Sequence, residues 1–172
     1  MATSVESRAV DAGTGGKGFY ICGRIADYWG ILRMKTKATS SLDAAQVLID
    51  KEEEGYYTAS IHCTYYAVFQ YIKYVLANTD TEPLSYEEQT AQARKMRMGS
   101  HDFVIEQIWK RISKQEENED AARDFAQTVR GLKRERVYAD YTTRQFTLEQ
   151  SLACKQTAEE LIAKLKTYFG DL

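Results

Sequence analysis

The sequence predicts an all-α protein, an antiparallel up-and-down bundle of four main helices plus one or two short ones. Two observations carry this prediction. The 172 residues include a single proline, and they are rich in Ala, Glu, Lys, Gln and Leu, with no β-branched stretch that would suggest a sheet. From about residue 40 onward, apolar residues recur at helical spacing and the connections are short, which favours neighbouring helices that pack against each other.

The first 34 residues differ from the rest. Residues 13–18 are glycine-rich, and the segment sustains neither a helical nor a strand period. Lys17 is followed by Gly18, so the phosphate-loop pattern, which needs Ser or Thr after the lysine, is not met. We expect residues 1–34 to be an N-terminal extension, flexible or derived from a cloning vector, and residues 35–172 to form the helical domain.

The first two predicted helices are separated by a glycine. Ser40 or Ser41 can cap a helix that runs to Glu54, where Gly55 interrupts the pattern. The second helix continues to the turn-forming segment 78–83. It is apolar nearly all round, which is typical of a helix at the centre of a bundle.

The next helices begin at polar caps. Ser85 with Glu88 forms a capping box that begins a short helix, and Gly99 ends it. Ser100 caps the following helix, and the fifth covers about residues 120–140.

The last helix begins at the capping box of Thr147 and ends at Gly170. Its predicted inward-facing residues are Leu161, Ile162, Leu165 and Phe169.

The charge, cysteine content and hydropathy of the chain limit the classes of function that it can have. The net charge of −2 gives no global basic field, so a nucleic acid could bind only at a local patch. Cys22, Cys63 and Cys154 are odd in number and widely spaced, as in a reduced cytosolic protein. No apolar run approaches the roughly 18 residues of a membrane span, and no signal peptide is apparent. We therefore expect a cytoplasmic protein that has no membrane segment and no cofactor.

The densest basic patch lies on the fifth helix and consists of Arg130, Lys133, Arg134 and Arg136. Arg130 and Arg134 share one face, and Lys133 and Arg136 share the adjoining one. A solvated helix face and phosphate binding explain these residues equally well. Arg136 and Asp140 are four residues apart, which predicts an intrahelical ion pair with Tyr141 packed nearby.

The chain has two histidines. His62 lies on the apolar second helix, so we favour a hydrogen-bonded core histidine over a base as its role. His101, beside Ser100, is most simply part of a helix N-terminus. Since neither histidine has a second ligand at metal-binding spacing, we expect no metal site.

Three motifs in this order resemble the HEPN superfamily over about residues 40–170. The first is the helix containing Gly55, Tyr57, Ala59 and Tyr65-Tyr66. The second is Ser100-His101, and the third is Leu132, Arg136, Ala139, Asp140 and Tyr141, followed by Thr147-Leu148-Glu149.

The resemblance implies a small all-α domain that cleaves or binds RNA in a toxin–antitoxin or defence system. It also implies a homodimer that brings two arginine helices together. In this family, active ribonucleases have a histidine a few residues after an arginine, whereas here no histidine follows His101. If the site is active, the resemblance implies that Arg136 stabilises the scissile phosphate. It also implies that Asp140 or Tyr141 orients or protonates the reacting RNA.

Beside the interpretation as a purely structural helical bundle with no connection to RNA, two functional hypotheses remain at this point. One is an RNA-binding HEPN-like protein, with RNA contacts from Arg130, Lys133 and Arg134, either with or without activity as a metal-independent endoribonuclease. The other is a non-catalytic dimeric module that binds a protein partner such as a nucleotidyltransferase-like antitoxin. The absent histidine favours the module, and the retained Arg-x-x-Ala-Asp-Tyr string favours the RNA-directed protein.

Overall fold

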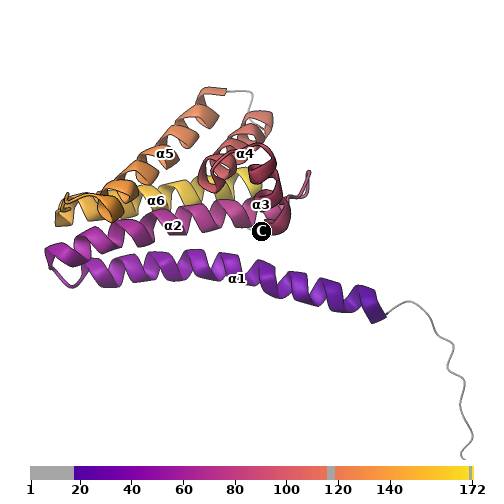
Figure 1. Ribbon diagram of the computed structural model, residues 1–172, viewed down its shortest axis with the longest axis horizontal. Helices are drawn as coiled ribbons and strands as arrows, with labels where there is room; N and C mark the ends of the chain where they lie inside the picture. The colour runs from indigo at the N-terminus through magenta and orange to yellow at the C-terminus, as the bar shows by residue number, and fades with distance from the viewer. Residues whose placement is uncertain (1–17, 116–118, 171) are drawn as a thin grey trace, which may run out of the picture.

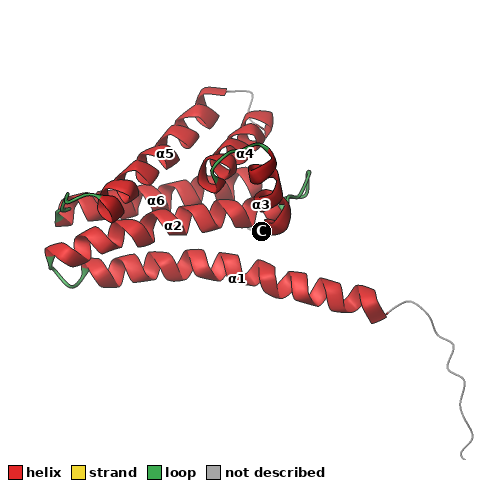
Figure 2. Ribbon diagram, viewed as in Figure 1, coloured by secondary structure: helices red, strands yellow, loops and turns green. Residues whose placement is uncertain are grey.

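The computed structural model describes residues 18–115, 119–170 and 172, with side chains from residue 34 onward. These residues form six helices and no strand (Figure 2). The helices are α1 (Gly18–Ile49), α2 (Glu54–Asn78), α3 (Tyr86–Lys95), α4 (Ser100–Gln115), α5 (Glu119–Tyr141) and α6 (Leu148–Phe169). The predicted all-α bundle is confirmed, with five long helices and one short one in the described part of the chain.

Helix α2 is the central element of the bundle. It packs against α1, α4, α5 and α6 (Figure 1). Thirteen of its 25 residues are buried, so it is enclosed on most sides. This arrangement follows from a helix that carries apolar or small residues nearly all round, because such a helix loses contact with water only when several neighbours cover it.

Helix α1 corrects the expectation for the N-terminal segment. It begins at Gly18, so residues 18–34 are helical, and Ser40 lies inside the helix instead of capping it. Over its whole length α1 has no single apolar stripe, which is why periodicity revealed only its C-terminal part. The N-terminal end of α1 extends past the other helices (Figure 1). Residues 1–17 lie outside the described residues, and a domain boundary at residue 34 stays a prediction.

Both predicted capping boxes are present. The Ser85 hydroxyl accepts from the Glu88 amide at 3.2 Å, and the Glu88 carboxylate accepts from the Ser85 amide at 2.8 Å. Thr147 and Gln150 form the same reciprocal pair at the start of α6. Gly170 ends α6 with φ of 78°, a left-handed conformation that a side chain would strain. These caps satisfy amide groups that would otherwise have no partner at helix ends.

A small second cluster of buried side chains positions the C-terminal end of α5. Tyr57, Ile61 and Phe146 form it, and Tyr138 of α5 packs against it. The Phe146 amide also donates to the Thr58 hydroxyl at 3.3 Å. These contacts hold the last turns of α5 against the N-terminal half of α2.

Candidate functional site

A polar cluster lies where α2 meets α5 and the first turn of α4. Helix α2 contributes His62, Tyr65, Tyr66 and Phe69, which share one face because they are three, four and seven residues apart. Helix α5 contributes Lys133, Arg136, Asp140 and Tyr141, and α4 contributes His101 and Asp102. We call these ten residues the α2–α5 cluster.

The Asp140 carboxylate joins two side chains within the cluster. Arg136 Nε forms an ion pair with Asp140 Oδ2 at 2.6 Å, as the four-residue spacing predicts. His62 Nδ1 lies 3.0 Å from Asp140 Oδ1 and 3.1 Å from Oδ2. The side chains of Arg136 and Asp140 are 14% and 19% exposed, whereas that of His62 is 47% exposed. Solvent can therefore reach the His62 imidazole, whereas the side chains of the Arg136–Asp140 ion pair are largely covered.

Two tyrosine rings fix the position of the Arg136 guanidinium. Its Cζ atom lies 5.2 Å from the centre of the Tyr66 ring and 5.5 Å from that of Tyr141, both within the range of cation–π attraction. Its Nη2 group donates to the Tyr66 hydroxyl at 2.9 Å. Since Tyr141 is 73% exposed, one side of the guanidinium is covered only by a ring that solvent can reach.

His101 occupies a more enclosed place than His62. Its Nδ1 lies 2.7 Å from the buried Tyr65 hydroxyl, and its ring stacks on Phe69 with centroids 4.2 Å apart. Burial lowers the pKa of His101, and the nearby positive charges of Arg136 and Lys133 lower it further. This histidine is therefore neutral at physiological pH.

The remaining charged pair of the cluster joins α5 to α4. Lys133 Nζ lies 2.5 Å from Asp102 Oδ1, with side chains 28% and 54% exposed. A pair this accessible contributes little to stability, because water and salt screen it. Lys133 lies three residues, about one helical turn, before Arg136 on α5.

The structure brings together four of the six site residues that the sequence predicts. Arg136, Asp140, Tyr141 and Lys133 lie in the cluster. Arg130 borders a separate hollow with Trp109, and Arg134 borders a groove with Cys154. These last two arginines are exposed and lie outside the cluster, one toward α4 and the other toward α6. Whether any of the six acts on a substrate stays a prediction.

The interpretation of His62 as a core histidine is wrong. Its side chain is about half exposed, and its hydrogen-bond partner is Asp140, 78 residues away in the sequence. Sequence reasoning missed this pair because the apolar residues around His62 suggested burial on every side of α2. One feature of the sequence could have indicated the pair. His62 is a polar residue, three positions before Tyr65, on a helix face that packs against another helix, so a polar partner on that helix is expected.

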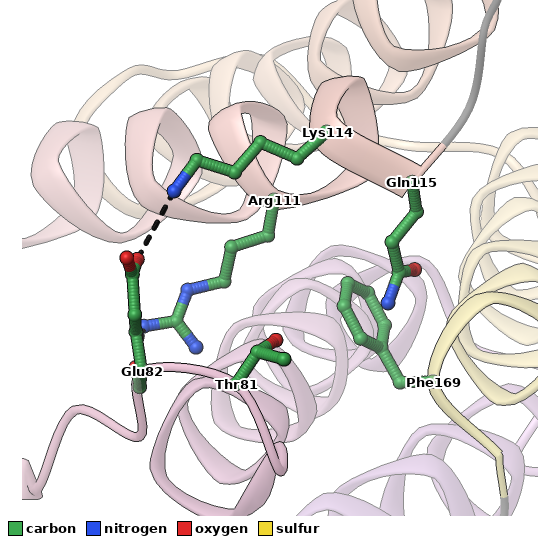
Figure 3. A pocket seen from close by; sticks show the side chains of 6 residues that line it. All are labelled: Thr81, Glu82, Arg111, Lys114, Gln115 and Phe169. Carbon is green, nitrogen blue, oxygen red and sulfur yellow. Dashed lines mark hydrogen bonds and ion pairs between the residues drawn. The ribbon is translucent and has the colours of Figure 1, made fainter.

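A hollow of about 480 Å³ lies between α4, the end of α6 and the loop after α2 (Figure 3). Its two cations are already engaged. Lys114 pairs with the Glu82 carboxylate at 3.1 Å, and Arg111 donates to the carbonyls of Leu76 at 3.2 Å and Glu82 at 2.5 Å. Arg111 therefore ties the end of α2 to the following loop, which makes this hollow a structural feature of the fold.

Thiol and metal chemistry find no support in the described residues. Burial raises the pKa of the Cys63 thiol and that of Cys154, the latter to about 11, so both remain protonated and weakly nucleophilic. Among the side chains described, no three His, Cys, Asp or Glu residues are grouped to hold a metal ion. Within the described part of the chain, none of the helices has the length and apolar character needed to cross a membrane.

The fold and the cluster define a small helical domain with an arginine–carboxylate pair on its penultimate helix. The family model of the HEPN domain matches residues 31–168. The chain therefore belongs to the HEPN domain family. Neither a curated protein nor a solved structure matches the chain. The predicted HEPN resemblance is confirmed.

Proposed function

We propose that this HEPN-domain protein acts on RNA in a prokaryotic or phage toxin–antitoxin or defence system, as a cytoplasmic homodimer and a metal-independent endoribonuclease. The observation that supports this proposal best is the arrangement around Arg136. A guanidinium held by Asp140 and Tyr66 stands beside an exposed imidazole and an exposed aromatic ring. The guanidinium can bind a phosphate group, the imidazole can transfer a proton, and a nucleobase can stack on the aromatic ring.

Arg136 is the phosphate ligand in this proposal. A guanidinium matches the geometry of two phosphate oxygens. The negative charge that develops on the oxygens of the phosphorane is best stabilised by a donor that is already in place. Tyr66 and Asp140 hold Arg136 by a hydrogen bond at 2.9 Å and an ion pair at 2.6 Å. Lys133 extends the positive surface along α5. The exposed ring of Tyr141 offers a face on which a base can stack.

Arg130 and Arg134 extend the binding surface of the proposal. Both are exposed on α5, outside the α2–α5 cluster: Arg130 lies toward α4 and Arg134 toward α6. In this proposal an RNA strand bound at Arg136 and Lys133 continues around α5 to reach Arg130 or Arg134. Since the protein carries a net charge of −2, this local patch must supply the electrostatic attraction.

The homodimer in this proposal joins two copies at one end of the bundle. Several apolar side chains are exposed on the end of α5 and the start of α6, namely Val137 (36%), Tyr141 (73%), Leu148 (38%) and Leu152 (44%). Both segments lie at the same end of the molecule (Figure 1). Two copies that meet there bring their Arg136 residues toward each other.

The second candidate function is a non-catalytic module that uses the same apolar surface. In this version the exposed side chains on α5 and α6 bind a protein partner such as a nucleotidyltransferase-like antitoxin, and the basic helix serves recognition. The observation in its favour is that Tyr141, the most exposed of these apolar residues, lies beside Arg136, where a bound protein would cover the site. Unimpaired RNA binding by an Arg136 variant would favour this version.

Replacing Arg136 by alanine tests the RNA proposal. We expect Arg136→Ala to weaken binding of fluorescein-labelled single-stranded RNA by about tenfold or more, because one phosphate contact is lost. The dependence of log Kd on log salt concentration should become shallower by about one. Fluorescence anisotropy at three or more salt concentrations measures both quantities.

The matched control is Arg123→Ala. Arg123 lies on the same helix, and its exposed side chain pairs with Asp120, three residues before it. This variant removes an equal charge outside the α2–α5 cluster, so its RNA affinity should stay close to that of the unmodified protein. Equal affinity losses in the two variants would contradict a specific role of Arg136.

A further inference from the structure

We propose that His62 is the general base of this site, oriented by Asp140, for attack of a ribose 2′-hydroxyl on the adjacent phosphate. This inference rests on the proposed ribonuclease function and names the residue that moves the proton. The sequence places no histidine after Arg136, but the fold brings one from α2 to the same carboxylate. Helix packing thus supplies a proton acceptor from a distant part of the chain.

The first argument is the tautomer of His62. An ionised carboxylate only accepts hydrogen bonds, so the nitrogen facing Asp140 must carry a proton. That nitrogen is Nδ1, at 3.0 and 3.1 Å from the two carboxylate oxygens. In the neutral ring the lone pair is then on Nε2. Among the residues that the structure describes, none forms a hydrogen bond with Nε2.

The second argument is that the orientation of His62 is fixed. Asp140 is held by Arg136 Nε at 2.6 Å, so its carboxylate stays in place. The His62 ring also lies against Tyr66, with centroids 4.5 Å apart. A carboxylate that holds an imidazole in one tautomer also stabilises the imidazolium that forms when the ring takes a proton. Asp140 is therefore a positioning residue, and His62 is the group that meets the substrate.

The third argument is the contrast with His101, the other histidine of the chain. Nδ1 of His101 faces the buried Tyr65 hydroxyl, and its ring is stacked on Phe69. Its side chain is less accessible than that of His62, and nearby Arg136 and Lys133 disfavour its protonated form. A base must both reach the substrate and accept a proton. Of the two histidines, His62 meets both requirements.

The reaction balances with the groups present. His62 Nε2 takes the proton of the 2′-hydroxyl, the 2′-oxygen forms a bond to phosphorus, and the bond from phosphorus to the 5′-oxygen of the next nucleotide breaks. The leaving 5′-oxygen takes a proton from the Tyr141 hydroxyl, and solvent returns to Tyr141 the proton that His62 releases. Arg136 stabilises the charge on the phosphorane. The products end in a 2′,3′-cyclic phosphate and a 5′-hydroxyl.

The test compares single-turnover cleavage of end-labelled RNA in EDTA by the full-length protein and by His62→Gln. We expect His62→Gln to cut about 10² to 10⁴ times more slowly, which is the usual contribution of a general base. Its affinity for RNA should stay within about threefold, because the imidazole is not the phosphate ligand. Added imidazole should restore part of the rate to His62→Ala, which only a group that transfers protons would do.

Each other outcome overturns the proposal in a distinguishable way. Wild-type cleavage with an undiminished rate in His62→Gln would place the base elsewhere and leave the proposed function intact. Parallel loss of RNA affinity and rate, without imidazole rescue, would make His62 a binding residue. RNA binding by the unmodified protein without any cleavage would overturn both the base and the ribonuclease activity. Because the His62 side chain is about half exposed, the thermal midpoints should agree and exclude misfolding as the cause.

Discussion

Phe103→Ala should destabilise the protein by about 3–5 kcal/mol, a large part of the roughly 5–15 kcal/mol that holds a typical domain folded. Phe103 lies in the first turn of α4, two residues after His101, and its side chain is fully buried in the main core. Truncation removes the apolar contacts of the ring and leaves a cavity that a bundle of packed helices fills only in part. Denaturant unfolding followed by circular dichroism measures the change.

The thermal midpoint should fall by about 10 °C or more for a domain of this length. The control is Val47→Ala on α1, since Val47 is 59% exposed and should change stability by less than about 0.5 kcal/mol. If Phe103→Ala were as stable as Val47→Ala, the packing of α4 against the bundle described above would be wrong.

Asp140→Asn should change RNA affinity and RNA cleavage in opposite directions. The carboxylate pairs with Arg136 at 2.6 Å, so it competes with an incoming phosphate and repels it. Without this charge, we expect RNA to bind about fivefold more tightly, which corresponds to about 1 kcal/mol. Anisotropy titration at low salt measures this gain, and high salt should reduce it.

Cleavage by Asp140→Asn should fall by about 10² to 10⁴, although the amide has nearly the shape of the carboxylate. The amide nitrogen can donate to His62 Nδ1 and thereby hold the ring in the tautomer whose Nε2 is already protonated. Such a ring accepts no proton from the 2′-hydroxyl. A variant that bound RNA less tightly, or that cleaved at the unmodified rate, would contradict the role given to Asp140.

Local features of the fold could be predicted from sequence because they depend on nearby residues. The capping boxes at Ser85 and Thr147, and the ion pair of Arg136 with Asp140, each join residues within four positions of each other. The central place of α2 could also be predicted from its apolar surface. In contrast, no capping residue directly precedes Gly18, where α1 begins, and the helix has no apolar stripe along its length. The start of α1 therefore could not be predicted from the sequence.

The contacts between different helices in the α2–α5 cluster depend on how the helices pack, so the cluster could be predicted only in part. His62 and Asp140 are 78 residues apart, and they meet because α5 crosses the N-terminal half of α2 at a particular rotation. A rotation of either helix by one residue would separate them. The adjacent residues Tyr65 and Tyr66 likewise take different roles, one toward His101 and the other toward Arg136, according to which neighbour each faces.

The most direct test of a metal-independent ribonuclease is the chemistry of the ends that the unmodified protein leaves on RNA in EDTA. End-labelled tRNA and mRNA are incubated with purified protein, and the product ends are identified by their response to phosphatase and kinase. We predict 2′,3′-cyclic phosphate and 5′-hydroxyl ends, since the attacking group is the 2′-hydroxyl. The absence of cleavage at high protein concentration, or 3′-hydroxyl and 5′-phosphate ends, would contradict this account and favour the protein-binding module.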